Sequence, residues 1–173
     1  RCCRRCRGAG WPAWRGGERC AGTVTIVAES VARYLPDSAA TAGPGAALAR
    51  AVLDVAPRQL VVYLDGGLGA GKTALTRAVL AGLGHMGRVP SPTYTLVEPY
   101  PLDSYRVFHV DLYRLRDPAE LDDLGLADEL GPGSLLLAEW PSKGAHRLPS
   151  ADLVCQLTMD GAGRRALLTA LTG

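Results

Sequence analysis

The segment Gly66–Thr73 constrains the fold of this chain more than any other feature. It reads Gly-Gly-Leu-Gly-Ala-Gly-Lys-Thr and fits the pattern G-x-x-x-x-G-K-[ST]. The nearly unbroken apolar run Gln59–Leu64 before it is typical of a strand buried on both faces of a sheet. After it, apolar residues recur at helical spacing, at Leu75, Val79, Leu80 and Leu83. A strand, a glycine loop and a helix in this order predict the α/β fold class.

The glycine loop has the composition of a phosphate-binding loop (P-loop). Its glycines let successive backbone N–H groups point inward at phosphate oxygens, where side chains would obstruct the turn. Lys72 is one of only two lysines in an arginine-rich chain, which favours a specific role in reaching the β- and γ-phosphates. The hydroxyl of Thr73 is placed to bind Mg²⁺. The predicted nucleotide-binding residues are Gly67, Leu68, Gly69, Ala70, Gly71, Lys72 and Thr73.

Two other interpretations of this loop remain open. A glycine-rich turn with an exposed lysine would carry no ligand, but it leaves the position of a rare lysine unexplained. The overlapping Gly69-x-Gly71-x-x-Ala74 also meets a loose dinucleotide-binding pattern. That pattern needs an acidic residue about 20 positions later at the end of a second strand, and Glu98 fits this poorly.

The remaining pattern predicts a single P-loop ATPase domain over residues 23–173, a three-layer fold with a mixed central sheet. Strands are expected at 24–28, 95–100, 105–111, 134–139 and 153–159. Helices are expected at about 46–55, after a turn at 35–38, and from 117–118 to Gly125. Residues 164–171 are expected to close the fold as a strand or a helix.

Residues 1–22 differ in composition from the rest and are predicted to be a disordered tail or a start-site artefact. They carry six Arg and one Glu, so the remaining residues have a formal charge of −3. A zinc knuckle from Cys3, Cys6 and Cys20, or an RNA-contacting arm, are the alternatives for this tail. The mildly acidic body argues against a large basic nucleic-acid surface. Its single cysteine, Cys155, excludes a disulfide framework.

No apolar run approaches the ~20 residues that cross a bilayer. The basic N-terminus is not followed by the apolar segment of a secretory signal. The sequence therefore predicts no membrane association and a cytoplasmic location.

Two acidic residues end predicted strands, Asp111 after Val107–Val110 and Glu139 after Leu135–Ala138. A P-loop site needs such a carboxylate to hold the metal ion or its water, because phosphate charge must be neutralised as the γ-phosphate leaves. The loop Ser91–Thr95 lies where NTPases often sense the γ-phosphate through hydroxyl groups. His85 and His109 have no partner that the sequence can assign, so neither is given a role.

Four ordered motifs together resemble the TsaE (YjeE) family over about residues 35–165. They are Gly66–Thr73, Ser91–Tyr100, His109–Leu115 and Glu139–Pro141. The resemblance implies a small bacterial cytoplasmic protein that binds ATP and Mg²⁺ and is a weak ATPase. It also implies a requirement in forming N6-threonylcarbamoyladenosine (t6A) next to the tRNA anticodon, with TsaD and TsaB as partners. Because the body is acidic, we expect tRNA to be reached only indirectly, through those partners.

The resemblance also assigns residues to roles. Lys72 and Asp111 would be catalytic, with Asp111 orienting the attacking water, and Thr73 and Glu139 would hold Mg²⁺. The other implied positions are Thr93 and Tyr94 in a switch-like loop, Thr41 and Gly163 near the adenine, and Trp140 on a nucleotide-sensitive or partner-facing surface. Gly67 departs from the family, which often has Asp there.

Two rival functions stay open. A small-molecule kinase would need a basic lid, for which four arginines are available: Arg114, Arg116, Arg164 and Arg165. A nucleotide-gated interaction module would bind ATP without turning it over.

Overall fold

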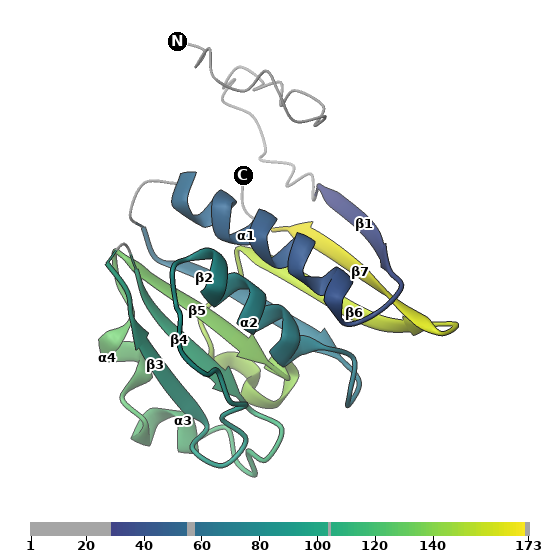
Figure 1. Cartoon of the computed structure of the whole chain (residues 1–173). Coiled ribbons are helices and arrows are strands. Elements are labelled where there is room, and N and C mark those ends of the chain that lie inside the picture. The colour runs from purple at the N-terminus through teal and green to yellow at the C-terminus, as the bar shows by residue number, and fades with distance from the viewer. Residues whose placement is uncertain (1–28, 55–57, 104, 172–173) are drawn as a thin grey trace, which may run out of the picture.

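The computed structural model describes residues 29–54, 58–103 and 105–171 (Figure 1). The predicted strand at 24–28 and the tail at 1–22 lie outside the described residues. Within the described part, the strands form one seven-stranded sheet in the order β1-β7-β6-β2-β5-β4-β3. Their bounds are β1 Ser30–Leu35, β2 Leu60–Gly66, β3 Val97–Pro101, β4 Arg106–Asp111, β5 Ser134–Glu139, β6 Leu153–Asp160 and β7 Gly163–Ala170.

Helices cover both faces of the sheet and complete three layers, as the sequence predicts. Helices α1 (Ala42–Asp54) and α2 (Lys72–Gly82) lie side by side on one face (Figure 1). The short helices α3 (Glu120–Asp123) and α4 (Leu126–Glu129), with the 3₁₀ segment η2 (Pro141–Arg147), contribute to the other layer. A further 3₁₀ turn, η1 (Ala39–Thr41), leads into α1.

The central strand β5 shows why the apolar runs have no alternation. Leu135 and Leu137 pack into the core beneath α1 and α2, whereas Leu136 and Ala138 pack into the core on the opposite face. Both faces are buried, so every position from Leu135 to Ala138 is apolar, between Ser134 at the start of the strand and Glu139 at its end.

The sheet is mixed in a way that positions the site. Strand β2 is parallel to β5 and β6, and β4 is parallel to β5, while β1, β3 and β7 pair antiparallel to their neighbours. The carboxyl ends of β2, β4 and β5 therefore meet at one edge. The register places Asp111 opposite Glu139, and Glu139 opposite Leu64.

Two expectations differ from the structure in detail, and one choice that the sequence leaves open is decided by it. The first helix begins at Ala42 rather than near residue 46, because Pro44 is tolerated in a first helical turn. The helix predicted from 117–118 to Gly125 is two short helices, since Gly125 adopts a left-handed φ of 62° between them. Segment 164–171, left open between strand and helix, is a strand that pairs with β6 and β1.

Candidate functional site

The glycine loop joins the end of β2 to the start of α2, and three of its glycines, Gly66, Gly69 and Gly71, have a positive φ that favours glycine. Gly66 has φ 146°, and a Cβ there would lie 2.3 Å from the carbonyl oxygen of Leu157. Gly71 has φ 106° and is the N-cap residue of α2. The loop thus delivers the chain directly into a helix N-terminus, where unpaired N–H groups and the helix dipole favour an anion.

Lys72 is held across this loop. Its Nζ donates to the carbonyl oxygens of Gly66, at 2.7 Å, and Gly67, at 2.9 Å, and lies 3.7 Å from the ring centroid of Trp140. The side chain is buried, which lowers the pKa of the ammonium, while the charges of Glu139, Asp111 and Asp65 act in the opposite direction. The Lys72 ammonium therefore lies beside the glycine loop, in contact with two backbone carbonyls and the ring of Trp140.

Glu139 connects the helix to two strands. Its Oε1 accepts a hydrogen bond from the hydroxyl of Thr73, at 2.8 Å, and another from Nε2 of His109, at 2.8 Å. Both Glu139 and His109 are buried, and no residue in the described part of the chain is hydrogen-bonded to the second carboxylate oxygen. One oxygen of the carboxylate is fixed and the other is left available.

The donor set at Thr73 and Glu139 fits Mg²⁺. A hydroxyl and a carboxylate lie in direct contact at the phosphate end of α2, and hard oxygen ligands are those that Mg²⁺ prefers. Among the described residues, no group of three or more His, Cys, Asp and Glu side chains forms a metal site by itself. Mg²⁺ usually takes only one or two protein ligands and completes its shell with water and substrate phosphates, so this pair is sufficient.

Asp111 anchors the loop after α2. Its Oδ2 accepts hydrogen bonds from the hydroxyls of Ser91 and Thr93, each at 2.7 Å, and its Oδ1 accepts one from the backbone N–H of Tyr113 at 3.0 Å. Thr93, which the resemblance assigns to a switch-like loop, therefore lies in contact with the acidic edge of the site. The exposed Tyr94 does not, because its ring stacks with Arg114, whose guanidinium carbon lies 4.3 Å from the ring centroid.

The two residues expected near an adenine, Thr41 and Gly163, lie in η1 and at the start of β7. Thr41 is buried in η1, which packs against α2, and its hydroxyl has no hydrogen-bond partner in the described residues. Gly163 begins β7, where a Cβ would lie 2.6 Å from the carbonyl oxygen of Leu35 and 2.6 Å from the hydroxyl of Tyr34. Gly163 thus packs against the chain that leads into η1.

Three contacts go beyond what the sequence predicts, although Ser91 lies in the predicted γ-phosphate-sensing loop and Arg164 is one of the four arginines considered for a kinase lid. His109 supports Glu139, Ser91 shares Asp111 with Thr93, and Arg164 lies against Gly71. A signal existed for His109, because it is the polar interruption in the apolar run of β4. Arg164 reaches the loop because β7 pairs with β1 and β6, and a local sequence pattern does not predict strand pairing.

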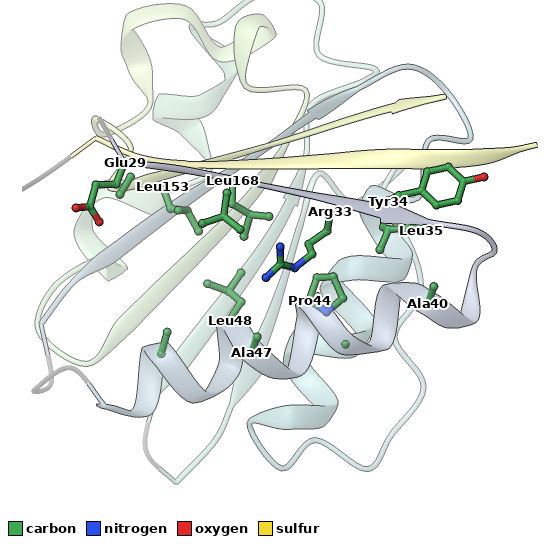
Figure 2. A pocket seen from close by; sticks show the side chains of 14 residues that line it. Glu29, Arg33, Tyr34, Leu35, Ala40, Pro44, Ala47, Leu48, Leu153 and Leu168 are labelled. Carbon is green, nitrogen blue, oxygen red and sulfur yellow. The ribbon is translucent and has the colours of Figure 1, made fainter. Parts of the chain in front are cut away.

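A cavity of about 540 Å³ lies elsewhere, between α1 and the strands β1, β6 and β7. Figure 2 shows Leu48, Leu153 and Leu168 lining it, with Arg33 reaching in from β1. None of the loop residues 66–73 lines this cavity, so it is separate from the candidate phosphate site. No helix in the described residues is long and apolar enough to cross a membrane.

Comparisons with known proteins show the family and the fold of this chain. Residues 35–167 match the family model described as threonylcarbamoyl adenosine biosynthesis protein TsaE. The tRNA threonylcarbamoyladenosine biosynthesis protein TsaE of Haemophilus influenzae is 43% identical over 145 residues, 83% of this chain and 92% of its own length. The protein of the same name from Bacillus subtilis is 34% identical over 113 residues, 65% of this chain and 70% of its own.

The fold has a solved counterpart. The crystal structure of Bacillus subtilis YdiB superposes with a TM-score of 0.66 at 23% identity, covering 84% of this chain and 88% of that one. At that identity the likeness shows a shared fold.

Proposed function

The chain belongs to the TsaE family of threonylcarbamoyl adenosine biosynthesis proteins, and on that premise we propose that it binds Mg²⁺-ATP and hydrolyses it slowly in the service of t6A formation. The observation that carries this proposal is the meeting of three groups at one end of α2. The ammonium of Lys72, the hydroxyl of Thr73 and the carboxylate of Glu139 converge on a glycine loop. Lysine and glutamate are rarely buried, and the burial of Lys72 and Glu139 at the same edge of the sheet is typical of a functional site.

Binding of the triphosphate follows from the loop. Backbone N–H groups at residues 67–73 would donate to the β- and γ-phosphate oxygens. Lys72 would exchange its contacts with the carbonyls of Gly66 and Gly67 for phosphate oxygens, a stronger interaction because the acceptor as well as the donor would then be charged. Thr73 and Glu139 would hold Mg²⁺, which supplies charge neutralisation as the γ-phosphate leaves.

Asp111 is proposed to orient the attacking water. It lies opposite Glu139 in the strand register, at the carboxyl end of β4. Its carboxylate is kept in place by Ser91, Thr93 and the backbone of Tyr113, so it is a preorganised acceptor. Because Ser91 and Thr93 belong to the loop after α2, a change at Asp111 on hydrolysis would be passed to that loop.

The partners are proposed to be TsaD and TsaB, with tRNA reached through them. Outside the first 22 residues the formal charge is −3, which does not favour direct phosphate-backbone binding. We propose that bound ATP raises the affinity for these partners and that hydrolysis resets it. Copurification of purified TsaB–TsaD with this protein in ATP and in ADP tests this, and equal recovery in both would contradict it.

The nucleotide proposal is tested with Lys72→Ala and its matched control Lys143→Ala, since these are the two lysines of the chain. Calorimetry with ATP and Mg²⁺ should give a Kd raised at least ~10-fold for Lys72→Ala, because a charge-assisted contact is lost, and unchanged for Lys143→Ala. Hydrolysis should fall in parallel. Full affinity and turnover in Lys72→Ala would overturn the proposal.

The same preparation separates the rival functions. Single-turnover incubation of ATP with Mg²⁺ should release inorganic phosphate. Transfer of the phosphoryl group to an added acceptor instead would identify a kinase. Binding without any turnover would identify a nucleotide-gated interaction module.

A further inference from the structure

Arg164, the second residue of β7, lies against the glycine loop. A Cβ on Gly71 would be 2.4 Å from Nη1 of Arg164, 3.5 Å from Cζ and 3.7 Å from Cδ. The guanidinium therefore packs directly on the backbone of the residue that precedes Lys72. Arg164 comes from a strand more than ninety positions later in the chain, and the pairing of β7 with β1 and β6 places it there.

The guanidinium of Arg164 has no hydrogen-bond or ion-pair partner within residues 29–54, 58–103 and 105–171. Its Nε is buried and makes no hydrogen bond to any residue in the described ranges. No acidic side chain of the described part forms an ion pair with it. Arginine remains charged at any physiological pH, and a buried donor on a charged group without an acceptor is unfavourable. The arrangement calls for an anion from outside the protein.

Arg165, the next residue on β7, is an arginine whose hydrogen bonds are made within the protein, in contrast to Arg164. Arg165 is exposed on the opposite face and is satisfied within its own hairpin, donating to Asp160 through Nε at 3.2 Å and Nη2 at 2.7 Å. The two side chains are adjacent in sequence and identical in chemistry. Only Arg164 faces the loop.

We propose that Arg164 binds the diphosphate portion of the nucleotide held by the loop, an inference that rests on the proposed function. Guanidinium groups bind phosphate oxygens in a bidentate fashion, and the site beside Gly71 is next to the backbone groups that would cradle the phosphates. A contact to the diphosphate is made equally by ATP and ADP. Arg164 thus retains the product as well as the substrate, and it ties β7 to the nucleotide.

The experiment compares Arg164→Ala and Arg164→Lys with the matched control Arg165→Ala, using calorimetry with ATP, ADP and GTP in the presence of Mg²⁺. Arg164→Ala should raise the Kd for ATP and for ADP by the same factor, on the order of 10-fold or more. Arg164→Lys should fall between the wild type and Arg164→Ala, because the charge is kept and the bidentate geometry is lost. Arg165→Ala should bind as the wild type does.

The outcomes separate this inference from the proposed function. If the wild type binds neither ATP nor ADP, the proposed function fails and the role of Arg164 falls with it. If the wild type binds ATP and ADP, and both Arg164 variants bind them with the wild-type Kd, only this inference is overturned. A contact to the base would change the ratio of the ATP and GTP affinities in Arg164→Ala, which contradicts a phosphate contact. If Arg164→Ala does not fold by circular dichroism, Arg164→Lys decides the question alone.

Discussion

At the scale of single residues, some side chains of the candidate site act by hydrogen bonding to a neighbouring side chain and fixing its position. His109 is fully buried and its only hydrogen bond in the described residues is to Glu139, while its Nδ1 has no partner there. The same oxygen of Glu139 also receives the hydroxyl of Thr73. His109 is therefore a positioning residue that fixes one carboxylate oxygen beside the hydroxyl of the loop.

His109→Leu removes that donor and should have two effects. The free energy of unfolding should fall by about 1–3 kcal/mol in urea titration, because a buried carboxylate loses a hydrogen bond. The Kd for ATP should rise in Mg²⁺ but change little in EDTA, since the altered group is the proposed metal ligand. His146→Leu, on the exposed part of η2, is the control. If the Kd for ATP of His109→Leu depends on Mg²⁺ as that of the wild type does, His109 has no role in positioning Glu139 for the metal ion.

The sequence predicts the residues of the site better than their partners. Lys72, Thr73, Asp111 and Glu139 follow from a local motif and from the ends of apolar runs. The bond between His109 and Glu139 depends on β4 lying beside β5 in a particular register, which is a long-range property. Both the loop Ser91–Thr95 and the resemblance place Tyr94 in a switch-like loop, but no local pattern reveals its stacking with Arg114.

At the scale of elements, α1 and α2 approach closely because small residues line their contact. A Cβ on Gly45 would lie 2.2 Å from the Cβ of Ala78, and a Cβ on Gly82 would lie 2.6 Å from the Cβ of Ala49. These glycines lower the intrinsic helix propensity, so they are explained by packing. The position of α2, and hence of the phosphate loop, depends on this contact.

Gly45→Ala is therefore expected to destabilise the protein more than Gly43→Ala does. Gly45→Ala inserts a methyl group against Ala78 of α2 and should lower the free energy of unfolding by about 1–3 kcal/mol. At Gly43, in the same helix, a Cβ would meet no atom within 4 Å outside the adjacent chain positions. The gain in helix propensity from Gly43→Ala is opposed by Pro44, which disfavours helical φ/ψ for a preceding residue with a Cβ, so the net change should stay within about 1 kcal/mol. Thermal unfolding of both variants is the measurement. A fall in Tm that is no larger for Gly45→Ala than for Gly43→Ala would contradict the packing explanation.

Element types were predicted well where one signal dominated and poorly at the edges of the sheet. The buried strands β2 and β5 are continuous apolar runs, which a local pattern identifies. Strand β1 is exposed at five of its six positions and has no alternation, so only its pairing with β7 makes it a strand.

At the scale of the whole molecule, Cys155 reports on the integrity of the core. It lies on β6 in the core beneath α1 and α2, and burial raises the pKa of its thiol from the ordinary 9.0 to about 12. The thiolate is the reactive form, so both burial and protonation protect it. Reaction requires an opening of the sheet.

Cys155 should therefore resist alkylation in native buffer and react rapidly once urea unfolds the protein. Pulse labelling with iodoacetamide, followed by peptide mass spectrometry, follows this thiol separately from the four cysteines before residue 21. Because the folded-state pKa is the higher one, stability is retained below pH 9 and should decline as the pH rises from there toward 12. Native labelling as fast as that of an unfolded peptide would contradict the packing of β6.

The pairing of β1 with β7 also sets a limit on when the fold can be completed during synthesis. The hydroxyls of Ser30 and Thr169 are hydrogen-bonded at 3.0 Å although 139 positions separate them in the chain. A nascent chain can form the hairpin of β6 and β7 only after residue 170 has been synthesised, and β1 must wait unpaired until then. Closing so long a loop makes this edge of the sheet a slow, late step, and the interval before it is when the chain is most vulnerable to proteases and to aggregation.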